Sequence, residues 1–267
     1  MKKEVCGIIV CVGWSKILEL TLPKNVKLLD EIYVVTKESD KDTQRVCAKY
    51  GNVHVRFYDF LISHSTWAAQ HEKYMLQNAS DRIKSEWREK SKDMDHFNDI
   101  LRLCFNKGGA IAHVQRELYE KKPLAFHALM DSDIILPSNI TNYIQGTNEQ
   151  NIQVYDRETA SIINGLELQS DVIYGAIHRI NYTSLSDYNN SKGTRTDAGI
   201  AGHFMLVNSL KKHLMDEWTN GCGADVWYPF GLPPIRFHKH TRLPLTIHHL
   251  GNATKSTIAR DFDFLFE

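Results

Sequence analysis

Two aspartates, Asp131 and Asp133, are separated by one residue and follow an apolar segment, residues 124–130. A short apolar run bounded by turn signals is typical of a strand buried on both faces. At a spacing of i and i+2 both carboxylates lie on one side of an extended backbone, where two like charges are costly unless a cation lies between them. A divalent cation takes such oxygen ligands, and a substrate phosphate can complete its shell. The pair therefore indicates either a metal site or a solvated turn of the kind that Asp favours.

A second stretch, Phe105-Asn106-Lys107-Gly108-Gly109, could bind an anion at the start of a helix. Two glycines let the backbone approach a ligand closely, and a helix N-terminus favours anions. The amphipathic pattern over 110–120 predicts the helix that follows. The same glycines also fit a plain tight connection, so both interpretations stay open.

The strands that must position these residues begin at the N-terminus. Nearly unbroken apolar runs over 5–12 and 31–35, the second closing on Thr36, predict two buried strands. Alternation over 53–57 predicts a third strand that ends near Asp59. Ligands of such an open α/β sheet bind at the carboxyl ends of its strands.

Two helices are expected between these strands. The first covers residues 15–21 and is predicted to end at Pro23. The second is predicted to begin at a capping box, Ser39 to Asp42, and to end at Gly51. The strand–helix alternation predicts a nucleotide-binding half, and the absence of a G-x-G-x-x-G motif after the first strand argues against a dinucleotide site.

The rest of the chain continues the pattern less regularly. The polar stretch 64–104 is expected to form one or two helices that pack on the sheet or cover the site. We predict one domain over 1–267, with a nucleotide-binding half at about 1–137 and an acceptor-binding half at about 138–252. Further elements are expected as loop and helix over 138–155, strands over 171–174, 204–207 and 243–247, a helix over 209–218 and a mobile, turn-rich loop over 187–197.

Composition limits the classes of partner. The chain has 267 residues, 42% of them hydrophobic, and its 32 Lys and Arg balance its 32 Asp and Glu, so no overall field attracts nucleic acid or an anionic membrane. No stretch is as long as a membrane span, and the apolar N-terminus fits a first strand better than a signal peptide. Five cysteines without C-x-x-C spacing predict reduced, buried thiols in the cytoplasm, or the host cytoplasm if a large virus encodes the protein. The oligomeric state is left open.

The order of these parts resembles that of glycosyltransferases with the GT-A fold, over roughly residues 4–252. The resemblance implies a mixed central α/β sheet flanked by helices, a nucleotide-diphosphate sugar as donor and a glycan as acceptor. Its parts are the N-terminal nucleotide half, Asn106-Lys107-Gly108 before the middle strand, Asp131-Ser132-Asp133, Gly202-His203-Phe204, Gly223-Ala224-Asp225-Val226 and His249-Leu250-Gly251.

The resemblance also implies the metal ligands. Asp133 is then the primary ligand, Asp131 its partner on ribose or metal-bound water, and His249 the third ligand, with His248 as the substitute. An imidazole beside carboxylates suits Mn²⁺ better than Mg²⁺. Two strand-end histidines with no metal are the alternative.

The remaining roles follow from the same resemblance. Asp225 is the candidate general base that would activate an acceptor hydroxyl for inversion at the anomeric carbon, although Gly-x-Asp is also a good helix cap. Many relatives have two acidic residues where this chain has Ala224 and Asp225. The residues implied for the nucleotide, most likely uridine diphosphate (UDP), are Val12, Thr36, Glu38, Asp59, Asn106, Lys107, Asp131 and Ser132. Those implied for the acceptor are Gly202, His203, Phe204 and Trp227.

Two other functions fit parts of the pattern. A sugar-1-phosphate nucleotidyltransferase also pairs an α/β sheet with a metal-binding Asp, but needs a glycine-rich basic loop where this chain has Gly13-Trp14-Ser15-Lys16. A non-catalytic nucleotide or carbohydrate binder on the same scaffold would bind ligand without turnover.

Overall fold

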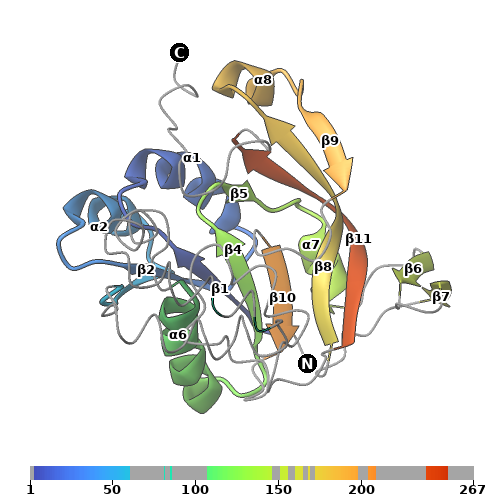
Figure 1. Cartoon of the computed structure of the whole chain (residues 1–267), viewed down its shortest axis with the longest axis horizontal. Coiled ribbons are helices and arrows are strands. Elements are labelled where there is room, and N and C mark those ends of the chain that lie inside the picture. The colour runs from blue at the N-terminus through green and yellow to red at the C-terminus, as the bar shows by residue number, and fades with distance from the viewer. Residues whose placement is uncertain are drawn as a thin grey trace.

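A nine-stranded mixed sheet forms the centre of the molecule (Figure 1). The computed structural model describes residues 3–60, 81, 85, 107–145, 151–155, 160–164, 168, 172–197, 204–208 and 239–251, without the side chains of 151–155, 160–164 and 239–240. The strand order is β3-β2-β1-β4-β10-β8-β11-β5, with β9 paired to β8. The predicted α/β class, with a mixed central sheet flanked by helices, is confirmed; the division into two halves stays a prediction.

Four parallel strands make up the first half of this sheet. They are β3 (Val53–Phe57), β2 (Glu31–Thr36), β1 (Val5–Val10) and β4 (Phe126–Asp131). The chain runs outward from β1 through β2 to β3, and β4 then pairs with the other side of β1. In open α/β sheets such a switch point leaves a crevice outside the carboxyl ends of the strands. Residues that follow β1 and β4 therefore lie where a ligand is expected.

The other strands pair in mixed directions. β10 (Phe204–Asn208) is antiparallel to β4 and β8 (Val172–Tyr182), whereas β11 (Lys239–Leu250) is parallel to β8. The short β5 (Ile134–Ile135) pairs antiparallel with the end of β11. A separate hairpin of β6 (Asn151–Tyr155) and β7 (Ala160–Asn164) stands to the right of the main sheet in Figure 1.

Helices cover both faces of the sheet because alternate strand residues point to opposite sides. Ile8 and Val10 of β1 pack in one cluster with Val114 of α6 (Lys107–Lys121). Ile9 packs in a second cluster with Leu22 of α1 (Ser15–Asn25) and with residues of α2 (Lys41–Cys47). The described part of the chain also forms the short helices α7 (Ile140–Gln145) and α8 (Leu185–Asn189).

The predicted limits of the first two helices were wrong. α1 continues through Pro23 to Asn25, because a proline in the last turn gives up only one helical hydrogen bond. Asp40, not Ser39, caps α2 and accepts a hydrogen bond from the Thr43 N–H. α2 ends at Cys47, and Gly51 lies in the turn that follows.

The turn-rich loop predicted over 187–197 was wrong at both ends of the segment, although residues 190–193 lie outside helix and strand. The segment begins in α8 and ends as β9 (Thr194–Asp197), whose pairing with β8 depends on residues distant in sequence. The stretch 64–104, apart from residues 81 and 85, and the helix expected over 209–218 lie outside the described residues.

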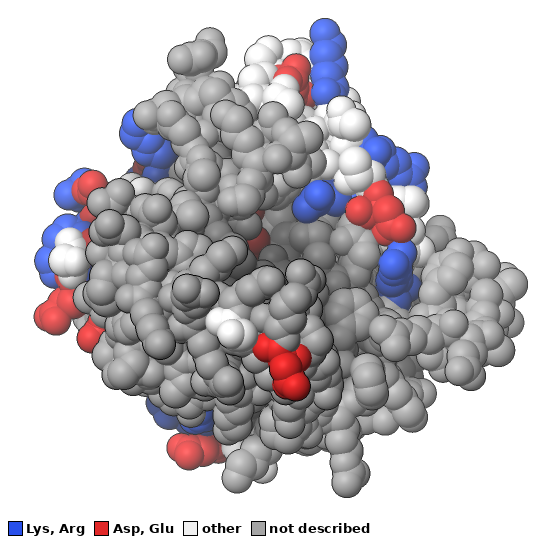
Figure 2. All heavy atoms as spheres, in the orientation of Figure 1, with Lys and Arg blue, Asp and Glu red and all other residues white. Residues whose placement is uncertain are grey.

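The surface agrees with the balanced composition. Figure 2 shows basic and acidic side chains interspersed around the described part of one face. No helix in the described part of the chain is long and apolar enough to cross a membrane.

The cysteines that the structure describes are buried. Cys6, Cys11 and Cys47 are free thiols, and burial raises the pKa of each to about 12. The prediction of reduced, buried thiols is confirmed for these three; Cys104 and Cys222 lie outside the described residues.

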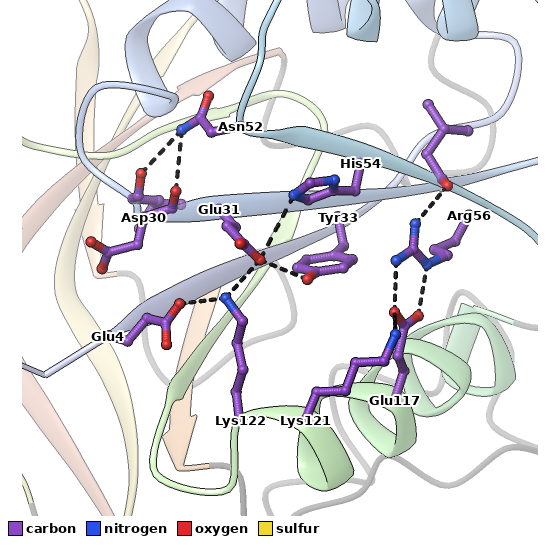
Figure 3. A network of polar contacts seen from close by, with 12 residues as sticks. Glu4, Asp30, Glu31, Tyr33, Asn52, His54, Arg56, Glu117, Lys121 and Lys122 are labelled. Atoms are coloured by element: carbon purple, nitrogen blue, oxygen red, sulfur yellow. Dashed lines mark hydrogen bonds and ion pairs between the residues drawn. The ribbon is translucent and has the colours of Figure 1, made fainter.

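A bidentate ion pair joins β3 to α6 across the sheet edge (Figure 3). Arg56 Nε and Nη2 donate to the two carboxylate oxygens of Glu117 at 2.7 and 2.6 Å, and Lys121 Nζ lies 2.9 Å from the same group. The hydrogen bonds from Arg56 lower the pKa of Glu117 to about 2. This stabilisation is therefore complete above the unfolded pKa of about 4.3 and is lost as the pH falls toward 2.

Glu117→Gln should lower the free energy of unfolding by about 1–3 kcal/mol at pH 7, because it removes a charged hydrogen-bond acceptor. Urea unfolding between pH 7 and pH 2 should show a smaller acid-induced loss of stability in the variant than in the wild type. Glu19→Gln, which changes an exposed partner of Lys49, is the matched control and should leave the curve unchanged. Equal acid dependence in wild type and Glu117→Gln would contradict the assignment.

Candidate functional site

The Asp131-Ser132-Asp133 segment lies at the switch point of the sheet. Asp131, the last residue of β4, is in register with Val10 of β1. All three residues are buried, and Ser132 and Asp133 are only 1% exposed. The predicted pair of carboxylates is therefore held inside the protein at the carboxyl end of β4 and is not a solvated turn.

Helix α1 fixes the backbone of this segment from one side. Thr21 Oγ1 donates to the carbonyl of Ser132 at 2.6 Å. Asn25 Nδ2 donates to the carbonyl of Ile134 at 2.8 Å, and Asn25 Oδ1 accepts from the N–H of Leu136 at 2.9 Å. Thr21 and Asn25 are four residues apart and so share one helix face. Neither residue was predicted. The only signal in the sequence is two polar residues at helical spacing on either side of Pro23.

Lys107 compensates the first carboxylate. Its Nζ lies 2.5 Å from Oδ1 of Asp131, and the two side chains are 8% and 11% exposed. Lys107 is the first residue of α6, three residues earlier than the predicted helix start, and the positive end of the helix dipole adds to its charge. Two residues implied for nucleotide binding are thus in contact.

His249 faces the second carboxylate. β11 pairs with β5 so that His249 is opposite Ile134, and the Leu250 N–H donates to the carbonyl of Asp133 at 2.9 Å. His249 Nε2 consequently lies 3.4 Å from Asp133 Oδ2, with both side chains 1% exposed. Residues 116 positions apart in sequence meet at one point.

The neighbouring histidine has different partners. His248 Nδ1 lies 2.8 Å from the hydroxyl of Tyr182, and its ring stacks on the Tyr182 ring with 5.7 Å between centroids. Burial lowers the pKa of His248. Of the two histidines left open by the sequence, the structure places His249 against Asp133.

The three residues implied as metal ligands form two separate contacts. Asp133 and His249 meet each other, whereas Asp131 meets Lys107, and the three do not all lie within 4.8 Å of one another. This geometry agrees with different roles for the two aspartates.

In the described part of the chain, one group brings three candidate ligand atoms within 4.8 Å of one another: Glu4, Cys6 and Glu31. Figure 3 shows Glu4 and Glu31 on either side of Lys122. Lys122 Nζ contacts both carboxylates, at 2.8 Å for Glu31. Burial raises the pKa of the Cys6 thiol to about 12. We interpret this group as an ion-pair network at the amino ends of β1 and β2.

Asp40 joins two segments at the same edge of the sheet, where the sequence predicts nucleotide binding. Its Oδ2 accepts from the Gly13 N–H at 2.7 Å and from the Thr36 hydroxyl at 3.2 Å, which joins the segment after β1 to the end of β2. Gly13 has a φ of 73°, which favours glycine. Burial opposes ionisation of Asp40, but hydrogen bonds from Gly13 and Thr43 lower its pKa overall. Thr36 was predicted from the sequence as a nucleotide-binding residue, whereas Asp40 was not.

The other residues implied for ligand binding differ in exposure. Val12 is half-buried, Glu38 and Asp59 are exposed, and Thr36 is fully buried. Phe204 on β10, next to β4, is 1% exposed, and its side chain packs in the hydrophobic core on one face of the sheet. The predicted residues that lie outside the described part of the chain are Asn106, Gly202, His203, Asp225 and Trp227.

Comparisons with known proteins give weak likenesses only. No protein-family model matches the chain, and no curated protein matches it. Among solved structures it is similar to 4-diphosphocytidyl-2C-methyl-D-erythritol synthase from Anaerococcus prevotii, with 11% identity and a TM-score of 0.41 over 100% of this chain and 97% of the other. A second structure of a synthase with the same name gives 11% identity and a TM-score of 0.40 over the same shares. At these values neither match bears on activity.

Asn25→Ala should destabilise the protein by about 2–5 kcal/mol, because it leaves the Ile134 carbonyl and the Leu136 N–H buried without their partner. Urea denaturation measures the loss. Asn190→Ala is the matched control; its exposed hydrogen bond to the Ser186 carbonyl can be replaced by water, so the expected change is within about 0.5 kcal/mol. A similarly small change for Asn25→Ala would show that α1 does not hold the segment.

Proposed function

We propose that this protein is a transferase that binds the diphosphate of a nucleotide through a divalent cation at the carboxyl end of β4. The observation that carries the proposal is the contact of the buried Asp133 and His249 side chains beside the Lys107–Asp131 pair, at the switch point of the sheet. Within this class we favour glycosyl transfer from a UDP-sugar to a hydroxyl of a glycan acceptor, with inversion.

The residues present fit a divalent cation. A carboxylate and an imidazole supply one oxygen and one nitrogen donor, a set that suits Mn²⁺. Oδ2 of Asp133 and Nε2 of His249 are 3.4 Å apart, whereas neighbouring ligands of an octahedral ion with bonds of about 2.1 Å are separated by about 3 Å. Only a small adjustment would therefore let both atoms bind one ion.

The buried hydroxyl of Ser132 also supports a ligand here. Within the part of the chain that the structure describes, Ser132 Oγ has no hydrogen-bond partner, although Ser132 is only 1% exposed. Buried polar groups nearly always have partners, so an orphaned hydroxyl between two candidate site aspartates suggests that a bound molecule completes its bonding. A ribose hydroxyl or a phosphate oxygen would do so.

Each residue of the site then has a chemical role. When bound, the cation would stabilise charge that develops on the leaving diphosphate. Asp133 and His249 would hold it away from water, and Lys107, at the positive end of α6, would contribute a second positive charge next to a phosphate. Asp131 would orient Lys107 and the ribose, and the Thr36–Asp40–Gly13 hydrogen bonds would set the floor of the nucleotide side.

Asp225 remains the proposed general base. Inverting transfer needs a carboxylate beside the acceptor hydroxyl, to take its proton as the oxygen attacks the anomeric carbon. Asp225, with Gly202, His203 and Trp227, belongs to the proposed acceptor half.

Nucleotidyl transfer is the second candidate. A sugar-1-phosphate nucleotidyltransferase also pairs an α/β sheet with a metal-binding Asp, so the buried aspartates at the end of β4 fit this reaction as well. The segment after β1 favours glycosyl transfer over nucleotidyl transfer. The Gly13 N–H donates to the Asp40 carboxylate and so does not point to a phosphate. A non-catalytic binder on this scaffold is the third possibility.

Asp133→Asn should abolish the manganese-dependent part of UDP binding, because it removes the anionic ligand at the centre of the site. Isothermal titration of UDP with and without Mn²⁺ should show an affinity loss of more than about 100-fold in the variant. Asp42→Asn, at an exposed position, is the matched control and should bind as the wild type does. Equal manganese dependence in Asp133→Asn and wild type would refute the metal role.

Asp225→Asn should bind UDP normally but lose at least about 100-fold in transfer rate, because the acceptor hydroxyl keeps its proton. Chromatography that separates UDP from pyrophosphate measures the rate and also the reaction class. With UDP-sugars and glycan acceptors, glycosyl transfer releases UDP; with UTP and sugar 1-phosphates, nucleotidyl transfer releases pyrophosphate. Release of pyrophosphate without release of UDP would replace the favoured function by the second candidate. Undiminished release of UDP by Asp225→Asn would rule out Asp225 as the general base.

A further inference from the structure

Asn181 connects the proposed metal site to a neighbouring strand. It lies on β8, is 5% exposed and is in register with His249 of β11 on one side and with Thr194 of β9 on the other. Asn181 Oδ1 lies 2.9 Å from Nδ1 of His249. The side chain therefore contacts the ring nitrogen that faces away from Asp133.

The hydrogen bonds of β9 fix which way this amide points. Asn181 Nδ2 donates to Thr196 Oγ1 at 3.0 Å and approaches the Thr194 carbonyl at 3.4 Å. A backbone carbonyl can only accept a hydrogen bond, so the nitrogen belongs on the β9 side and the oxygen on the His249 side. The Thr196 hydroxyl lies 3.5 Å from the Arg179 carbonyl, to which it can donate while it accepts from Asn181.

This orientation sets the tautomer of His249. Because an amide oxygen only accepts, Nδ1 of His249 carries a proton, so Nε2 is the ring nitrogen through which a metal ion would bind. Nε2 lies 3.4 Å from Oδ2 of Asp133. One divalent cation could bind both atoms.

We propose that Asn181 is a positioning residue for the metal site: its amide oxygen holds the proton on Nδ1 of His249 and so presents Nε2, together with Asp133, to a divalent cation. This inference rests on the proposed metal-binding function. Groups of this kind orient histidine ligands and strengthen metal binding in many metalloproteins. Thr194 and Thr196 of β9 act indirectly, because they accept hydrogen bonds from the Asn181 amide nitrogen and so orient that side chain.

Electron paramagnetic resonance of the full-length protein with Mn²⁺ and UDP tests the inference. In the wild type, pulsed measurements should detect coupling of the bound Mn²⁺ to a histidine ¹⁴N nucleus, and titration should give the affinity. Asn181→Leu, which is similar in volume but lacks an acceptor, should weaken the ¹⁴N coupling and lower Mn²⁺ affinity by about 10- to 100-fold. Asn181→Asp, which keeps an acceptor oxygen, should retain the coupling.

Matched variants separate this role from a general structural one. Asn190→Leu, at an exposed position, should change neither the coupling nor the affinity. If Asn181→Leu does not fold, Thr196→Val carries the test, because it removes the nearer of the two acceptors of the amide nitrogen, leaves only the 3.4 Å contact with the Thr194 carbonyl, and should lower the Mn²⁺ affinity several-fold. The role of Asn181 would be overturned if a folded Asn181→Leu kept the ¹⁴N coupling and the Mn²⁺ affinity of the wild type. The same result in Thr196→Val would overturn it if Asn181→Leu does not fold. A wild type without bound Mn²⁺ would instead contradict the proposed function.

Discussion

The compensation of two buried carboxylates at the end of β4 is the constraint on which the site depends. Asp131 and Asp133 project from one short segment into the interior, where an uncompensated charge costs several kcal/mol. The two carboxylates have different neighbours: Asp131 contacts the Lys107 ammonium, and Asp133 contacts the His249 imidazole. In the proposed function the second contact is the position of the cation, and Asp131 is the partner of the metal ligand.

Several distant parts of the chain must be correctly placed for that compensation to exist. The parallel pairing of β1 and β4 brings the acidic segment to the switch point, and α1 fixes its backbone through Thr21 and Asn25. The pairing of β5 with β11 then delivers His249, and β8 and β9 orient the ring through Asn181. The pairing of these strands therefore places Asp131, Asp133 and His249 at one edge of the sheet, next to Lys107 of α6.

The sequence predicted the parts of this arrangement that local pattern determines. Unbroken apolar runs located β1, β2 and β4, and their order gave the α/β class. The aspartate pair and Lys107 were found because each adjoins a recognisable strand end or helix start. The extension of α1 past Pro23 was missed because a proline in the last turn gives up only one helical hydrogen bond, and Asn25 makes two hydrogen bonds to the backbone of residues 134 and 136.

The supporting residues could not be predicted, because their roles arise only from tertiary pairing. Asn25, Asp40 and Asn181 are ordinary polar residues in sequence, and each acquires its function from a partner on another element. β9 was predicted as loop for the same reason, since four polar residues, three of them exposed, become a strand only when β8 is beside them. The choice between His248 and His249 likewise depended on strand register.

Anomalous diffraction from crystals soaked with Mn²⁺ and UDP tests the central claim most directly. The account predicts a manganese peak within bonding distance of Asp133 Oδ2 and His249 Nε2, with the diphosphate on the same ion and Lys107 close to a phosphate. A manganese–UDP complex bound elsewhere, with the Asp133–His249 contact unchanged and no metal between the two side chains, would contradict it.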